Sequence, residues 1–139
     1  MATKVLFLCT GNSARSQMAE AFLRKLGAGQ FEAFSAGLEP REINPLTVRV
    51  MEEIGFDMSG HRSKGIDEYF GKEHFQYLVT LCDDAEKNCP RVWPGGNQRM
   101  HWSFEDPSAF DGSEETKLAK FRQVRDQIQV KVSSWVKEF

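Results

Sequence analysis

The sequence predicts an α/β fold in a single domain, with parallel strands joined by crossover helices. Residues 3–8 and 31–35 have the apolar patterns of strands, and each leads into a stretch in which apolar residues recur every three or four positions. Two more strand patterns cover residues 76–81 and 99–104, and a long amphipathic stretch follows them. Strands that alternate with helices form parallel sheets, so this order of elements indicates an α/β architecture.

The ends of the first two predicted helices carry recognisable signals. The first helix follows a polar loop at residues 9–16 and ends at the glycine-rich residues 27–29. Asn44 and Pro45 predict the cap and the first turn of the second helix, and Gly55 predicts its end.

The second half of the chain contains an irregular segment and the longest helix. Residues 57–72 are polar and irregular, with one short helix near residues 66–70. Ser113 predicts the cap of the last helix, because acidic residues follow it in the first turn. We expect the apolar stripe of this helix in the core: Leu118, Phe121, Val124, Ile128, Val132, Trp135 and Phe139.

Composition and charge narrow the range of functions. The chain has 139 residues, of which 40% are hydrophobic and 27% charged, as expected for one globular domain. Its net charge of −2 provides no general basic surface for nucleic acid or an anionic membrane. No segment has the length and apolarity of a signal sequence or a membrane span. We therefore expect a cytoplasmic protein that binds neither nucleic acid nor membranes.

The loop after the first strand has the composition of an anion-binding site. It begins with Cys9 and ends with Arg15, and the residues between them are small or polar: Thr10, Gly11, Asn12, Ser13 and Ala14. Amides at the start of a helix bind anions, and an arginine side chain fits a tetrahedral oxyanion. We expect the same field to favour Cys9 as a nucleophilic thiolate, with Ser16 donating its hydroxyl to the sulfur. A cysteine after an apolar strand is otherwise often a core residue, but a core cysteine needs no arginine and no loop of small residues.

Two more chemically useful side chains follow predicted strands. Cys82 comes directly after residues 76–81, and Asp106 comes shortly after residues 99–104. The carboxyl ends of parallel strands border the ligand crevice, so we expect both side chains on the same side as Cys9. Asp106 is the candidate acid that protonates a departing oxygen. An aspartate before proline is also common in ordinary turns.

Cys82 and Cys89 lie seven residues apart, with Pro90 directly after them. In a helix they would stand roughly 10 Å apart along the axis, whereas a disulfide needs Cα atoms within about 7 Å of each other. A bond between them would require this weak helix to unwind. The alternatives are two unrelated thiols or half of a zinc site, which lacks further ligands at zinc spacings. His61 and His74 also lack metal-like partners and are expected at the surface, so we expect no metal site.

Together these motifs resemble those of the thioredoxin-coupled arsenate reductases, which have the low-molecular-weight tyrosine phosphatase fold. The resemblance covers nearly the whole chain and implies a single-domain three-layer α/β/α sandwich with a four-stranded parallel sheet over residues 1–139. The loop at residues 9–16 does not separate the two families, because both place a cysteine and an arginine six residues apart. The pair of Cys82 and Cys89 is the specific signal.

The resemblance also implies a mechanism. The loop and Arg15 would hold arsenate, Cys9 would attack arsenic, and Asp106 would protonate the departing oxygen. Cys82 would then attack Cys9 and release arsenite. Finally Cys89 would attack Cys82, and thioredoxin would reduce the resulting Cys82–Cys89 disulfide.

The chain departs from the family pattern at two positions. Ala14 stands where members commonly carry another cysteine that the relay does not use. Lys64 stands where some members have an aspartate that binds potassium with side chains corresponding to Asn12, Glu20 and Ser35. We hypothesise that the Lys64 ammonium occupies the potassium position and pairs with Glu20, so that no bound cofactor is needed. The alternative is a solvated lysine.

Two other functions fit parts of the sequence. A low-molecular-weight tyrosine phosphatase would use Cys9, Arg15 and Asp106 in the same way but would not need the other two cysteines. Such phosphatases usually place an aromatic residue after the acid-proline pair, where this chain has Ser108. A non-catalytic oxyanion or redox sensor would show a ligand-dependent switch without turnover. We take a monomer as the default state.

Overall fold

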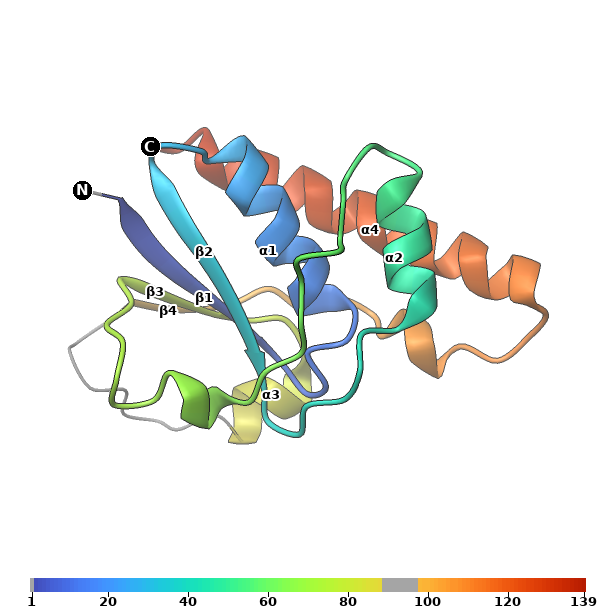
Figure 1. Ribbon diagram of the computed structural model, residues 1–139, viewed down its shortest axis with the longest axis horizontal. Helices are drawn as coiled ribbons and strands as arrows, with labels where there is room; N and C mark the ends of the chain where they lie inside the picture. The colour runs from blue at the N-terminus through green and yellow to red at the C-terminus, as the bar shows by residue number, and fades with distance from the viewer. Residues whose placement is uncertain (1, 89–97) are drawn as a thin grey trace.

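The computed structural model describes residues 2–88 and 98–139, and in these ranges it contains four strands, four α-helices and two short 3₁₀-helices (Figure 1). In chain order these are β1 (Thr3–Cys9), α1 (Arg15–Leu26), β2 (Phe31–Gly37), α2 (Pro45–Glu52), η1 (Ile66–Glu68), β3 (Tyr77–Thr80), α3 (Asp83–Asn88), β4 (Gln98–His101), η2 (Pro107–Ala109) and α4 (Glu114–Val136).

The strands form one parallel sheet in the order β2-β1-β3-β4. Helices α1, α2 and α4 cover one face of the sheet, and the short α3 lies on the other (Figure 1). The predicted three-layer α/β/α arrangement with a four-stranded parallel sheet is therefore confirmed.

The central strand β1 is buried on both faces, as its continuous apolar run predicts. Val5 and Phe7 point into the larger core cluster under α1 and α4 and have no exposed surface. Leu6 and Leu8 point into the smaller cluster on the α3 side and are equally buried. The alternation fixes the register of β1, since a slip of one residue would exchange the two faces.

The predicted stripe of α4 is buried over most of its length: Leu118, Phe121, Val124, Ile128, Val132 and Trp135. The expectation that Phe139 is a core residue is wrong, because α4 ends at Val136 and Phe139 is 54% exposed. Its ring still packs on Trp135, with ring centroids 5.1 Å apart. Neither α4 nor any other helix in the described residues is long and apolar enough to cross a membrane.

Several element boundaries differ from those expected, most clearly those of α2 and β4. The second helix ends at Glu52 rather than at Gly55, where φ is +87°. Strand β4 ends at His101, because its partner β3 ends at Thr80. The chain nevertheless continues beside β3, since Trp102 N donates to Thr80 O at 2.8 Å. The expected short helix near residues 66–70 is η1.

The sheet brings the ends of three strands to one edge. Cys9 closes β1, Cys82 follows β3 by two residues, and Asp106 follows β4 by five. Cys9 and Asp106 line the same cavity, and the hydroxyl of Thr10 lies 3.5 Å from the sulfur of Cys82. The expected position of these side chains at the carboxyl edge is what the structure shows.

Candidate active site

The loop between β1 and α1 is held from inside by Asn12. This residue is fully buried and has a φ of 52°, a left-handed conformation that asparagine tolerates better than most residues. Its amide nitrogen donates to Ser16 Oγ at 2.7 Å, and its Oδ1 accepts from the Lys64 backbone N–H at 2.9 Å. The side chain of Gln17, also fully buried, donates to the Asn12 backbone carbonyl at 3.1 Å. Asn12 thus connects the loop to α1 and to the segment around Lys64.

The carbonyl groups of the loop are all bonded to neighbouring groups. Residues 38–47 satisfy most of them from outside, for example through Glu39 N to Thr10 O at 2.8 Å and Arg41 N to Gly11 O at 2.8 Å. In the described part of the chain, the amides of residues 11–14 donate to no protein atom. A helix start with unpaired amides is a binding site for an anion.

Gly37 allows the end of β2 to approach this loop. A Cβ atom at this position would lie 2.7 Å from the Thr10 carbonyl oxygen and 2.9 Å from the Asn12 amide nitrogen. Both neighbours are backbone atoms and cannot move aside as a flexible side chain would. A glycine is therefore required for the outer segment to satisfy the loop carbonyls.

Arg15 and Asp106 meet at the cavity. Arg15 is buried, its Nη1 donates to the Phe104 carbonyl at 2.9 Å, and its Nη2 lies 3.6 Å from Asp106 Oδ2. Its Nε is buried without a hydrogen-bond partner. A buried donor without an acceptor is costly, so this nitrogen is suited to bind an oxyanion.

The cavity itself has a volume of about 250 Å³, which suits a small tetrahedral anion rather than a large ligand. Its lining residues are Cys9, Thr10, Gly11, Ser13, Ala14, Arg15, Arg41, Asp106 and Ser108. Asp106 Oδ1 accepts hydrogen bonds from the Ser108 backbone at 3.0 Å and from its hydroxyl at 2.7 Å. The second carboxylate oxygen remains beside Arg15.

Cys9 and Cys82 are hydrogen-bonded to each other. This bond lowers the pKa of Cys82 to about 5, and the Thr10 hydroxyl and the Ala85 amide, 3.5 and 3.4 Å from its sulfur, act in the same direction. The same bond, with burial, raises the pKa of Cys9 against the attraction of Arg15. At neutral pH the pair therefore holds one proton and one negative charge. The sequence predicted a negative charge on Cys9 alone, whereas in the structure the two thiols share this charge.

Ser16 lies under the loop, where its oxygen accepts the hydrogen bond from Asn12. Both Ser16 and Cys9 lie within the described residues, and the structure shows no hydrogen bond between the Ser16 hydroxyl and the Cys9 sulfur. The expected direct contact with the nucleophile is thus not present, because Asn12 draws the Ser16 oxygen toward itself. Ser16 supports the loop from below.

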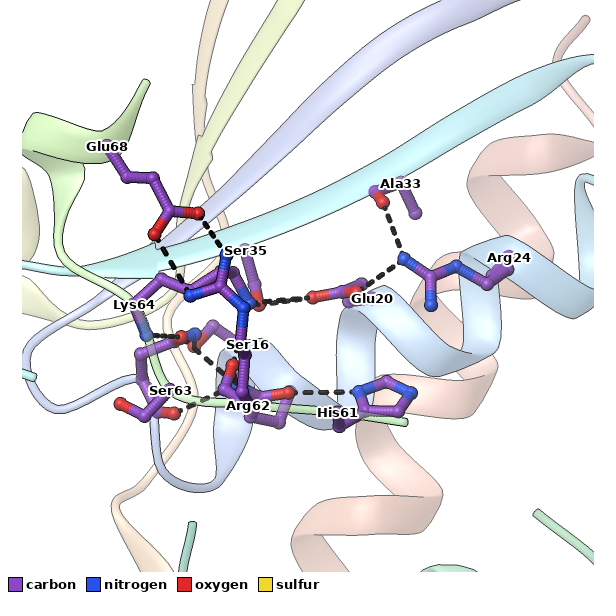
Figure 2. Close-up of polar contacts among 12 residues, drawn as sticks. Ser16, Glu20, Arg24, Ala33, Ser35, His61, Arg62, Ser63, Lys64 and Glu68 are labelled. Atoms are coloured by element: carbon purple, nitrogen blue, oxygen red, sulfur yellow. Dashed lines mark hydrogen bonds and ion pairs between the residues drawn. The ribbon is translucent and has the colours of Figure 1, made fainter. Parts of the chain in front are cut away.

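Lys64 lies in a buried polar cluster beside the loop (Figure 2). Its Nζ is 3.4 Å from Ser35 Oγ and 3.7 Å from Glu20 Oε1, and it donates to the Arg62 carbonyl at 2.8 Å. Ser35 also donates to Glu20, and Arg24 pairs with the other oxygen of Glu20 at 2.6 Å. Burial lowers the pKa of Lys64, while the Glu20 carboxylate counteracts it. The Lys64 side chain is therefore buried, and the alternative of a solvated lysine is wrong.

Some features of the site have no clear signal in the sequence. His61, expected at the surface, is half-buried, and its Nδ1 lies 3.0 Å from Gln17 Oε1 (Figure 2). Arg41 lines the cavity from the segment between β2 and α2, in which no motif points to a ligand. Gln17 could have been recognised from the sequence, because it is a polar residue on the buried face of the first helix. Cys89 lies outside the described residues. Within the described residues, no group of three or more histidine, cysteine or acidic side chains is arranged to hold a metal ion.

The unpaired amides and Arg15 suit a tetrahedral oxyanion, and the Cys9 thiol lines the same cavity. Fold and site together define a cysteine-dependent enzyme of the phosphatase type that acts on small oxyanions. The chain belongs to the low molecular weight phosphotyrosine protein phosphatase family, whose model matches residues 4–139.

Comparisons within this family point to one branch. The chain is 41% identical over 131 residues to an arsenate reductase of Halalkalibacterium halodurans, covering 94% of this chain and 93% of the relative. It is 43% identical over 124 residues to the arsenate reductase of Bacillus subtilis, covering 89% and 88%. A solved arsenate reductase in the phosphate binding state superimposes with a TM-score of 0.81 at 34% identity, covering 98% of both chains.

The shared charge of the thiol pair can be tested by titration. In a Cys89→Ser background, thiolate ultraviolet absorbance should rise with a midpoint near pH 5, where the Cys82 proton is lost. Cys9→Ala removes the hydrogen bond that lowers this pKa most, so we expect the midpoint to rise by about one pH unit or more. Cys82→Ala should abolish the low midpoint. A midpoint that Cys9→Ala leaves unchanged would show that the thiols are independent.

Proposed function

We propose that the protein is an arsenate reductase that reduces arsenate to arsenite with three thiols, Cys9, Cys82 and Cys89, and that thioredoxin regenerates them. The observation that carries this proposal is a second thiol beside the nucleophile: the Cys82 sulfur lies 3.5 Å from the hydroxyl of Thr10, the residue after Cys9, and the two thiols shift each other's pKa. A phosphatase needs one nucleophilic thiol, whereas a two-electron reduction needs a second thiol to form a disulfide. Relatives at 41% and 43% identity are named arsenate reductases, which supports the same choice.

The first step joins arsenic to Cys9. The amides of residues 11–14 and Arg15 hold arsenate with one oxygen toward Asp106. The two thiols hold one proton between them, and Cys9 attacks as the thiolate when this proton moves to Cys82. A sulfur–arsenic bond forms and one arsenic–oxygen bond breaks. Asp106 protonates that oxygen, which leaves as water.

The second step is the reduction. Cys82 transfers its proton to an oxygen of the bound arsenic group, and the resulting thiolate, stabilised by the Thr10 hydroxyl and the Ala85 amide, attacks the sulfur of Cys9. A disulfide forms, the sulfur–arsenic bond breaks, and its electron pair stays on arsenic. Arsenic(V) thereby becomes arsenic(III), which leaves as arsenite. Because the two thiols already lie next to each other, this attack needs no large movement of the chain.

The last step transfers the disulfide away from the cavity. Cys89 attacks Cys82, Cys9 leaves as a thiolate, and the dithiol of thioredoxin reduces the Cys82–Cys89 bond. In the sequence Cys82 and Cys89 stand directly before and after the residues of α3, and a helix that included both would hold them roughly 10 Å apart. We therefore propose that α3 unwinds in this step. Its length of six residues makes it a marginal helix.

Phosphatase activity is the second candidate, because the family model is that of a phosphatase and the cavity also fits phosphate. Cys9, Arg15 and Asp106 would serve it without change. Ser108 stands after Pro107, where it bonds to Asp106 and offers no ring for a phosphotyrosine to stack on. We expect a weak side activity toward aryl phosphates.

Loss of Cys82 should separate the two activities. Reduced wild-type protein mixed with arsenate, without thioredoxin, should release about one arsenite per protein. We expect Cys82→Ala to release none while it still hydrolyses an aryl phosphate within about threefold of wild type, and Cys9→Ala to lose both reactions. Arsenite from Cys82→Ala, or none from the wild type, would refute the reductase assignment.

We also propose that the Lys64 ammonium takes the place of the potassium ion bound by some members of the family. Its position among Glu20, Ser35 and the Arg62 carbonyl supports this, since these oxygen atoms would suit a monovalent cation. Arsenate turnover should then be the same in potassium and sodium chloride at equal ionic strength. A severalfold higher rate in potassium alone would contradict the replacement. Lys64→Met should destabilise the fold, because it leaves Glu20 with less positive charge nearby.

Thiols that must stay reduced suit the cytoplasm, where thioredoxin is available. Large hydrophobic side chains exposed in the described residues come from different segments, with Leu26 and Val130 lining one cavity: Leu26, Phe70, Phe110, Val130 and Phe139. This distribution supports a monomer.

A further inference from the structure

Arg41 is a second arginine at the cavity, and the mechanism above does not use it. It lies in the segment between β2 and α2, and its side chain lines the cavity together with Cys9 and Arg15. It also borders an adjoining cavity of about 450 Å³ formed by residues 40–43 and 61–63. Arg41 therefore lies at the boundary between the two cavities.

The position of Arg41 is tied to the oxyanion loop. Its backbone N–H donates to the Gly11 carbonyl at 2.8 Å. Its side-chain carbons Cδ and Cγ lie 3.6 and 3.7 Å from the position that a Cβ on Gly11 would occupy, so the stem of the arginine lies over this glycine. Any movement of the loop relative to this segment would break the bonds that satisfy the loop carbonyls. Arg41 therefore has a defined place beside the amides.

The charge of Arg41 is not neutralised by a partner within the described residues, where no carboxylate lies within ion-pair distance of its guanidinium. Glu39 and Glu42 are its acidic neighbours in sequence, and both are exposed. Asp106, the acid of the cavity, lies beside Arg15 and Ser108 instead. The cavity is thus lined by one buried arginine, Arg15, and by one exposed arginine, Arg41, which borders the adjoining cavity.

This arrangement has a consequence for substrate and product. Arsenate, like phosphate, loses its second proton close to neutral pH, and a second guanidinium favours the dianion over the monoanion. Arsenite is uncharged at neutral pH. A cation at the boundary of the cavity therefore attracts the substrate without holding the product.

We propose that Arg41 is a specificity-determining residue that binds an outward oxygen of the oxyanion and selects its doubly charged form. The proposal rests on the assigned arsenate reductase activity for the identity of the substrate. It does not depend on the redox steps, because it concerns only the binding of the oxyanion.

The test compares Arg41→Gln with wild type in steady-state arsenate reduction. We expect the KM for arsenate to rise about tenfold, equivalent to roughly 1.4 kcal/mol, with kcat within about twofold. The inhibition constant of phosphate should rise by the same factor, and Arg41→Lys should fall between the two. The control is Arg49→Gln, an exposed arginine of α2 that pairs with Glu114 at 3.9 Å and should change neither constant.

A second readout needs no turnover. Inorganic phosphate should protect the active-site thiols from alkylation, and its dissociation constant should decrease from pH 6 to pH 8 in wild type but much less in Arg41→Gln. If this difference appears while arsenate is not reduced, the assigned activity fails and the role of Arg41 stands. Equal phosphate binding by both proteins, or a change confined to the KM for thioredoxin, would overturn the proposal.

Discussion

The site depends on the way in which the backbone of one loop is hydrogen-bonded. The carbonyls of residues 9–14 are bonded to the segment that follows β2, to Gln17 and to α1. The amides of residues 11–14 remain without protein partners in the described residues and can serve an oxyanion. Asn12 and Gly37 make this possible, the first by its left-handed backbone and the second by the absence of a side chain. The loop is thus prepared before any ligand binds.

The parallel sheet places a second thiol, Cys82, beside this oxyanion site. Adjacent strands β1 and β3 end at the same edge, so Cys9 and Cys82 come into contact although they are far apart in sequence. The start of α3 stabilises negative charge on Cys82 through the Ala85 amide. With this second thiol, a site of the kind that transfers phosphoryl groups with one thiol has the two cysteines that a two-electron reduction of the substrate needs.

The sequence predicted those parts of the site that depend on local motifs. Cys9 and Arg15 lie in one short loop, and the alternation of strands and helices was sufficient to place Cys82 and Asp106 at the same edge. The shared charge of the thiols could not be predicted, since it depends on a contact between two strands. Arg41 was missed for a similar reason: its role depends on packing over Gly11, which no pattern in its own segment reveals.

The most direct test of the relay is to trap its intermediate in the Cys89→Ser variant. The reduced variant is mixed with arsenate without thioredoxin, quenched by alkylation, digested and analysed by mass spectrometry without reduction. The account predicts about one arsenite per protein and a disulfide that links the peptides of Cys9 and Cys82. Arsenite without this linked peptide would show that the two thiols do not form the disulfide that reduces arsenic, and the account would be wrong.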